Sequence, residues 1–202
     1  KKKINLKILK NKKKILRNIQ AEARNVRYKI LINYCRKNSI KILLTAHNLE
    51  DQVETFLIRL SRGSGLKGLS SMRSLTKIDN KVSLYRPLLE VKKNSLIKIS
   101  KKIFGKFVKD PSNKNTKFLR TKIRNLKKPL ESSGIKYDQI FRSIQNLSIS
   151  KNTLDQHLNK TFKDLISKRN KKIVIDFKKF KGLNIEVKIA LLNKSIKMLK
   201  KN

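Results

Sequence analysis

The chain has 202 residues, which is enough for one medium-sized domain or for one domain with a smaller one attached. Its formal net charge of +40 favours a polyanionic partner, nucleic acid above all, and its apolar residues form periodic segments rather than the scattered pattern of a disordered chain. The single cysteine, Cys35, excludes a disulfide framework and fits a reducing cytoplasm, and no apolar run is long enough to suggest a membrane partner.

Predicted strands and helices alternate as far as residue 129. In chain order they are a strand at residues 4–9, a helix at 14–37, a buried strand at 39–46, a helix at 49–61, a loop with two glycines at 62–65, a strand at 82–89, and helices at 95–104 and 116–127. Helix, strand and helix in this order predict an α/β domain built on a parallel sheet.

The remainder of the chain has a different pattern. Its expected boundary is marked by turn-forming residues, namely Pro129, Ser132, Ser133 and Gly134. Beyond that boundary, residues 137–165 predict one or more helices, residues 173–175 form a short apolar stretch, and residues 185–199 predict a last helix. The sequence therefore predicts two domains, residues 1–129 and residues 130–202, of which the second is smaller and mainly helical.

The segment from Thr45 to Thr55 carries the clearest chemical signal. It lies where a predicted parallel strand gives way to a helix, which is the edge at which open α/β sheets bind ligands. His47, Asp51 and Glu54 are spaced i, i+4 and i+7 and therefore share one helical face. An imidazole and two carboxylates on one face can hold Mg²⁺ with a nucleotide, bind an ammonium group or take a proton. The alternative is an exposed acidic first turn that the helix dipole favours.

The predicted helix at residues 116–127 is strongly basic. Its apolar stripe leaves Lys117, Arg120, Arg124 and Lys127 together on another face, which is suited to phosphate contacts. The alternative is an ordinary solvated basic face in a lysine-rich chain. Only 12 of the 53 basic residues are arginines, so arginine at both central positions favours the phosphate-binding interpretation.

Several motifs resemble one known family. The segment Ala46-His47-Asn48-Leu49-Glu50-Asp51-Gln52-Val53-Glu54-Thr55 resembles the Ala-His-His-x-Asp-Asp-Gln-x-Glu-Thr motif of the PP-loop ATP pyrophosphatases, with Asn48 and Glu50 as departures. Residues 59–69 resemble the Arg-Gly-Ser-Gly-x-x-Gly-Leu signature of the tRNA(Ile)-lysidine synthetases within that group. Three further similarities, at residues 20–28, 86–89 and 110–124, extend the resemblance. On these motifs, the chain resembles the lysidine synthetase family from about Gln20 to Pro129.

The resemblance implies a Rossmann-like PP-loop ATPase domain followed by a helical tRNA-binding domain. It implies ATP-dependent ligation of free L-lysine to the wobble cytidine of tRNA(Ile) with a CAU anticodon, with ATP and Mg²⁺ as cofactors. The implied catalytic residues are His47, Asp51 and Glu54, with Asp51 also a candidate for Mg²⁺. The implied substrate- and nucleotide-binding residues are Arg24, Glu50, Arg62, Gly63, Ser64, Gly65, Asp110 and Asn113. The implied tRNA-binding residues are Lys117, Arg120, Arg124 and Lys127.

The family's phosphate-binding loop, Ser-Gly-Gly-x-Asp-Ser, is absent from this sequence, in which no glycine precedes Gly63. We therefore expect the loop to lie upstream of Lys1, an apolar sheet face to be uncovered, and the chain by itself not to form lysidine. Two other functions stay open at this point, a PP-loop tRNA thiolase and a catalytically silent RNA-binding remnant. Pairing of two copies into a homodimer is also left open.

Overall fold

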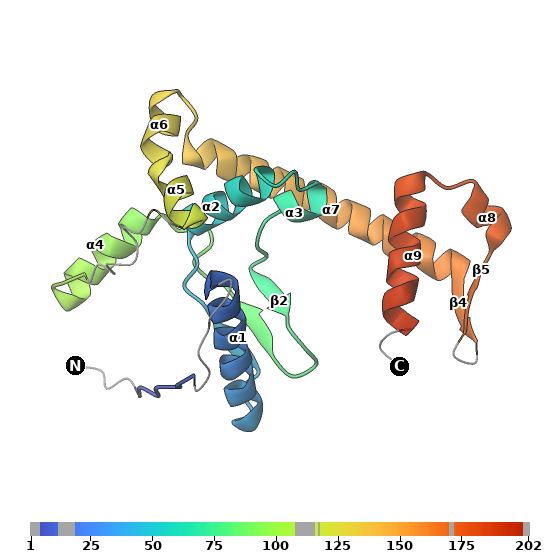
Figure 1. Cartoon of the computed structure of the whole chain (residues 1–202), viewed down its shortest axis with the longest axis horizontal. Helices are drawn as coiled ribbons and strands as arrows, with labels where there is room; N and C mark the ends of the chain where they lie inside the picture. Colours follow the sequence, from blue (N-terminus) through green and yellow to red (C-terminus); the bar gives the residue numbers. More distant parts are fainter. Residues whose placement is uncertain (1–4, 12–18, 108–115, 117, 170–171, 200–202) are drawn as a thin grey trace. The chain divides into compact units, whose positions relative to one another are not determined.

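The computed structural model describes residues 5–11, 19–107, 116, 118–169 and 172–199 (Figure 1). These residues form two compact units. The first comprises Lys1–Thr55 and Met72–Lys128, and the second comprises Phe56–Ser71 and Pro129–Asn202. Each unit is described separately below.

The first unit is built around a three-stranded mixed sheet. The strands β1 (Ile42–Leu44), β2 (Leu75–Lys77) and β3 (Ser83–Tyr85) have the order β1-β3-β2. β1 pairs with β3 in parallel, as predicted, whereas β2 pairs with β3 in the antiparallel sense and was not predicted. Asp79 stabilises the turn between β2 and β3, because its Oδ1 accepts hydrogen bonds from the N–H groups of Lys81 (2.7 Å) and Val82 (2.8 Å). The α/β fold class is confirmed.

The helices of this unit follow the apolar periodicity of the sequence. They are α1 (Ile19–Lys37), the first part of α2 (Leu49–Leu60), α4 (Lys93–Phe104) and α5 (Leu119–Asn125). The helix predicted at residues 116–127 is interrupted at Leu126, and α6 (Lys127–Ser132) begins directly afterwards. Pro129 lies in the first turn of α6, where its missing N–H would have no intrahelical partner. This explains why Pro129 does not end the helical segment.

Two predictions about strands were wrong. Residues 5–9 form no strand, and Leu6 and Ile8 are exposed, because the sheet in the described part of the chain offers them no neighbouring strand. β1 was predicted to be buried, yet Ile42 and Leu44 are 55% and 62% exposed. The cause is an uncovered sheet face, as expected from the sequence: Tyr85 and Leu75, which the strand pairing places on the same face as Ile42 and Leu44, are 40% and 56% exposed as well.

The second unit combines helices with a two-stranded antiparallel hairpin. Its elements are the end of α2, α3 (Leu66–Leu69), most of α6, α7 (Tyr137–Leu165), β4 (Ile166–Arg169), β5 (Lys172–Ile175), α8 (Phe177–Lys181) and α9 (Ile185–Leu199). Its core joins the end of α7, the start of β4 and the middle of α9 through Phe162, Leu165, Ile166 and Leu191. These contacts bury one face of α9.

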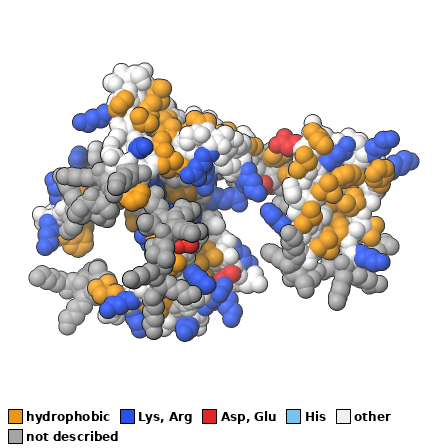
Figure 2. All heavy atoms as spheres, viewed as in Figure 1, with side chains coloured by type: hydrophobic (Ala, Val, Ile, Leu, Met, Phe, Trp, Pro, Cys, Tyr) orange, Lys and Arg blue, Asp and Glu red, His pale blue; other side chains and the backbone are white. Residues whose placement is uncertain are grey.

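A second apolar row on α9 remains exposed. Its members recur at alternating spacings of four and three, and they are Ile185, Ile189, Leu192, Ile196 and Leu199. Figure 2 shows hydrophobic side chains gathered over this part of the second unit, with lysines around them. Among the described residues, no helix combines the length and the apolar character that a membrane span needs.

Candidate functional site

The parallel pair of strands brings two segments to one edge of the sheet. Because β1 and β3 run in the same direction, the residues that follow them, His47 and Arg86, leave the sheet at the same end. The N–H of Thr45 donates to the carbonyl of Tyr85 at 3.0 Å, which extends the pairing to this edge. The segment that carries His47 therefore lies at the edge of the sheet where the sequence predicted it.

His47 lies half-buried at this edge. Thr45 Oγ1 is 3.0 Å from His47 Nδ1, so the hydroxyl fixes the orientation of the imidazole ring. Burial lowers the pKa of His47 below its ordinary value of 6.5; the carboxylate of Asp51 opposes this shift, and the guanidinium groups of Arg86, Arg24 and Arg120 add to it. The imidazole is therefore neutral at pH 7 and able to accept a proton.

The two departures from the family motif have structural explanations. Asn48 caps α2, because its Oδ1 accepts the N–H of Asp51 at 3.0 Å while Asp51 Oδ2 accepts the N–H of Asn48 at 3.1 Å. Asparagine is among the best capping residues. Glu50 reaches the start of α4, where its Oε2 accepts the N–H of Lys93 at 2.8 Å, and its Oε1 lies 3.5 Å from Lys127 Nζ. Both residues thus fix the position of α2.

Glu54 is the most deeply buried carboxylate of the segment, with its side chain 2% exposed. Its two oxygens accept hydrogen bonds from Arg124 Nε (2.7 Å) and Nη2 (3.0 Å) and from Arg120 Nε (2.8 Å). Arg120 Nη2 also donates to Asp51 Oδ1 at 2.9 Å, so one guanidinium bridges Asp51 and Glu54. α2 and α5 are therefore joined by two acidic and two basic side chains that lie far apart in sequence.

The ion pairs between α2 and α5 differ from the contacts that the sequence predicted for these residues. His47, Asp51 and Glu54 were expected to face a ligand, and Arg120 and Arg124 were expected to contact tRNA. In the structure, both oxygens of Glu54 are occupied by arginines, whereas Asp51 is 22% exposed on its side chain and lies next to His47. Of the predicted trio, His47 and Asp51 are thus the two side chains that stay partly exposed.

A magnesium site needs several oxygen or nitrogen ligands that converge on one point. No group of three His, Cys, Asp or Glu side chains that could hold a metal ion occurs in the described parts of the chain. The oxygens of Asp51 already accept from Arg120 and from the N–H of Asn48. The described residues therefore do not form a site for Mg²⁺ on their own.

The glycine segment that follows α2 belongs to the second unit. Gly63 has a φ of 67° and ends α2: its N–H donates to the carbonyl of Leu60 (2.9 Å), and that of Ser64 donates to the carbonyl of Arg59 (3.1 Å). An anion-binding loop would use these two N–H groups to contact its ligand. Here both donate to carbonyl groups of the last turn of α2 instead. A Cβ at Gly68 would lie 2.6 Å from Ser64 Cβ, so this position requires glycine for the close approach of α3.

The remaining predicted residues are distributed as follows. Arg24 lies over the ring of Tyr28 at 5.2 Å from its centroid and contributes to the field at His47. Arg62 and Gly65 are exposed in the second unit. Asp110, Asn113 and Lys117 lie outside the described residues.

Sequence reasoning omitted Arg86 from the site. It is 7% exposed, and its Nη1 donates to the carbonyl of Arg73 (2.9 Å) and to Thr76 Oγ1 (3.0 Å). Its buried Nε has no acceptor within the described part of the chain. The signal was available, since arginine is scarce in this chain and Arg86 begins one of the segments, residues 86–89, that resemble the family. Arg24, Arg86 and Arg120 together make the surroundings of His47 favourable for an anion.

Comparison with known proteins identifies close relatives by sequence. The chain is 36% identical over 186 residues to the tRNA(Ile)-lysidine synthase of Wolbachia pipientis wMel, which covers 92% of this chain and 43% of that protein. It is 45% identical over 118 residues to the tRNA(Ile)-lysidine synthase of Orientia tsutsugamushi (strain Boryong), which covers 58% of this chain and 26% of that protein. The chain thus spans less than half the length of these relatives.

Structural and family comparisons concern the fold. A solved structure of a U34-tRNA thiolase from Methanococcus maripaludis matches 66% of this chain and 45% of its own chain, with a TM-score of 0.52 and 20% identity. At that identity the likeness shows the fold alone. Residues 1–130 match the PP-loop domain family, and since this match covers more than half of the 202 residues, the chain belongs to that family.

Proposed function

We propose that the protein uses ATP to ligate L-lysine to C2 of the wobble cytidine of tRNA(Ile) with a CAU anticodon, and so forms lysidine. One observation carries the proposal. At the carboxyl edge of the parallel strands, a neutral His47 lies beside Asp51, whose carboxylate binds the guanidinium of Arg120, and the charges of Arg24, Arg86 and Arg120 all act on His47. The relatives named tRNA(Ile)-lysidine synthase support the choice of reaction.

In the first proposed step, the C2 oxygen of the cytidine attacks the α-phosphorus of ATP, and pyrophosphate leaves. Charge develops on the phosphate oxygens during this step, and positive groups in fixed positions stabilise it. Arg86 and Arg120 are held by hydrogen bonds to other parts of the first unit, so they need little reorganisation when the charge forms. We propose that they and Arg24 face the α-phosphate of ATP, which becomes the single phosphate of the adenylated intermediate.

In the second proposed step, the ε-amine of lysine attacks C2, and AMP departs with the former C2 oxygen. Asp51 already binds a guanidinium in this structure, and we propose that it exchanges part of that contact for an amino group of lysine and so positions the substrate. The attacking amine loses a proton as the C–N bond forms. His47 is neutral at pH 7 and lies beside Asp51, so we propose that it accepts this proton.

Other residues take supporting roles in the proposal. Glu54 positions Arg120 and Arg124, and Glu50 positions α4 and Lys127. Lys127, together with Lys117, remains a proposed contact of tRNA, and Asp110 and Asn113 remain proposed substrate contacts. We propose that Mg²⁺ arrives with ATP, and no step above depends on it.

The second domain, residues 130–202, is proposed to bind tRNA. A tRNA substrate implies a cytoplasmic location for the protein. Pairing of two copies also stays a prediction.

The test is incorporation of labelled lysine into a tRNA(Ile) transcript by the whole protein that the gene encodes, with any segment before Lys1 or after Asn202. We expect ATP-dependent incorporation, and we expect Asp51→Ala to abolish it while Glu90→Ala, at an exposed carboxylate of the same unit, leaves it unchanged. Transfer of sulfur instead of lysine would support a thiolase. Binding of tRNA without any transfer would support a silent RNA-binding protein.

A further inference from the structure

The second unit contains a groove of about 730 Å³ between α3, α7 and α9. Its floor is apolar and includes Leu154, Leu158 and Leu191, the last of which is fully buried. One rim comes from α3, which is the helix formed by the glycine segment. The opposite rim comes from α9, and every lining residue belongs to the second unit.

Lysines stand on both rims of this groove. Lys67 lies on the α3 side and is exposed, while Lys194 and Lys197 lie on the α9 side. Lys194 is held in place, because its Nζ donates to Asn159 Oδ1 at 2.6 Å and lies 4.2 Å from the centroid of the Phe162 ring. A side chain that is already ordered loses less conformational freedom when a ligand binds.

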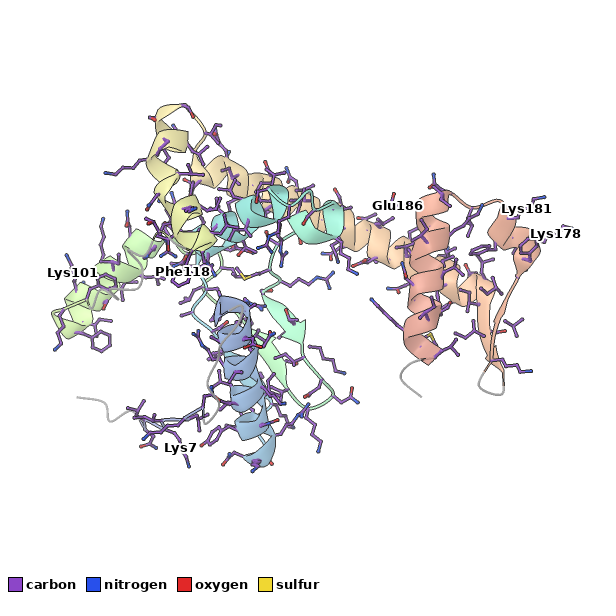
Figure 3. All side chains as sticks on the ribbon, in the orientation of Figure 1. Lys7, Lys101, Phe118, Lys178, Lys181 and Glu186 are labelled. Atoms are coloured by element: carbon purple, nitrogen blue, oxygen red, sulfur yellow. The ribbon has the colours of Figure 1, made fainter. Side chains whose placement is uncertain are left out.

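The acidic residues of the groove do not balance this charge. Asp155 is paired with a fourth lysine, Lys151, at 2.6 Å. Glu186 lies at the first turn of α9 (Figure 3). The whole unit has 20 Lys and Arg residues against six Asp and Glu residues, so the groove carries positive charge inside a positively charged unit. A polyanion is the ligand class that this charge favours.

The apolar floor narrows the choice among polyanions. Two cationic rims above a hydrophobic floor match the chemistry of a nucleic-acid strand, whose phosphates face the lysines while a ribose or base packs on Leu154 and Leu158, the two floor leucines that are partly exposed. The amide side chains of Asn159, Asn184 and Asn193 line the same groove. Oδ1 of Asn159 accepts from Lys194 and Oδ1 of Asn184 accepts from the N–H of Glu186, so these two amides offer their NH2 groups as donors to a base edge.

We propose that the groove between α3, α7 and α9 binds the sugar-phosphate backbone of RNA, with Lys67, Lys194 and Lys197 as phosphate contacts. The choice of RNA rests on the function proposed above, which makes tRNA the substrate. The glycine segment then serves this groove: Gly68 lets α3 pack against Ser64, and Arg59 Nη1 donates to the carbonyl of Gly68 at 2.7 Å. The segment that resembles a family signature would thus build an RNA-binding wall rather than a phosphate loop.

The test compares two triple variants of the whole protein that remove equal charge from the same unit. The groove variant is Lys67→Gln, Lys194→Gln and Lys197→Gln. The control variant is Lys172→Gln, Lys178→Gln and Lys181→Gln; these three lysines are exposed and do not line the groove, and Figure 3 shows Lys178 and Lys181 on α8. The dissociation constant for a tRNA(Ile) transcript is measured by filter binding over a series of salt concentrations.

We expect the groove variant to bind tRNA at least about tenfold more weakly than the control variant at about 0.15 M salt. Its plot of log affinity against log salt should be shallower by about 2 to 3, since each lost phosphate contact lowers this slope by about 1. Equal losses in the two variants would mean that only overall charge matters, and this result would overturn the proposal.

A second variant tests the floor without changing the charge. Ala190→Trp fills the groove from α9, and we expect at least about fivefold weaker binding with an unchanged salt slope, since no phosphate contact is removed. Unaltered affinity in a variant with an unaltered circular dichroism spectrum would refute the groove as the site. Weaker binding of polyglutamate but not of tRNA by the groove variant would assign the groove to an acidic protein.

The same proteins separate this inference from the proposed function. If the whole protein incorporates lysine but its affinity for tRNA does not depend on the groove lysines, the groove is not the RNA-binding site, while the proposed function is supported. If binding of tRNA depends on the groove lysines but the whole protein transfers no lysine, the groove is supported as the RNA-binding site and the proposed function is refuted.

Discussion

Replacement of Glu54 by glutamine should destabilise the first unit by far more than the same change at an exposed carboxylate. Glu54 Oε1 and Oε2 accept three hydrogen bonds from the guanidinium groups of Arg120 and Arg124, and the side chain is 2% exposed. Removing one partner of a buried ion pair costs about 3–5 kcal/mol. The two arginine side chains are 32% and 30% exposed, so water screens part of the loss, and we expect about 2–3 kcal/mol.

The assay is urea unfolding of the chain followed by circular dichroism, since urea does not screen charges as a guanidinium salt would. Glu90→Gln is the matched control, because it makes the same chemical change at an exposed position and should shift the unfolding free energy by less than about 0.5 kcal/mol. A cycle that adds Arg124→Gln should show a coupling of at least about 1 kcal/mol with Glu54→Gln. Equal effects of Glu54→Gln and Glu90→Gln would refute the reasoning.

Three further predictions concern local structure, each measured through the free energy of unfolding. Asn48→Ala removes the cap of α2 and should cost about 1 kcal/mol, whereas Asn48→Ser keeps an acceptor and should cost clearly less. Gly68→Ala should cost more than about 1 kcal/mol, and Ser64→Gly should relieve much of that loss; no relief would mean that Ser64 is not the obstructing residue. The N–H of Lys81, then Arg36 and the N–H of Val82, lower the pKa of Asp79 from 3.8 to about 2, so its contribution is present above 3.8 and is lost as the pH falls to about 2. Asp79→Asn should abolish this part of the acid sensitivity, and an unchanged pH profile would contradict the assignment.

Much of the fold could be predicted from local sequence patterns. The helices α1, α2, α4 and α9 follow apolar residues that recur every three or four positions, and that periodicity is a property of the segment itself. β2 was missed because three residues in an exposed hairpin carry too little pattern to be recognised. The burial of β1 was mispredicted because an apolar run does not tell whether one or both faces of the sheet are covered by other elements.

The sequence predicted where the candidate site lies, but not which basic side chains pair with Asp51 and Glu54. The sequence shows that His47 and Asp51 follow a strand, so their position at the edge of the sheet could be inferred. Which basic groups meet Asp51 and Glu54 depends on how α5 packs on α2, and no local pattern contains that information. The capping role of Asn48 was readable, since asparagine three residues before an acidic residue at a helix start is a capping pattern.

The central claim is that the protein attaches lysine to one nucleoside of one tRNA. Its most direct test is mass spectrometry of the nucleosides of tRNA(Ile) transcripts after incubation of the whole protein with ATP and isotopically labelled lysine. We predict that the wobble cytidine of the CAU anticodon gains the mass of labelled lysine less one water, and that the Asp51→Ala protein leaves it unmodified. The proposed function would be contradicted if, after incubation with the unsubstituted whole protein, the wobble cytidine carried no lysine or carried sulfur instead.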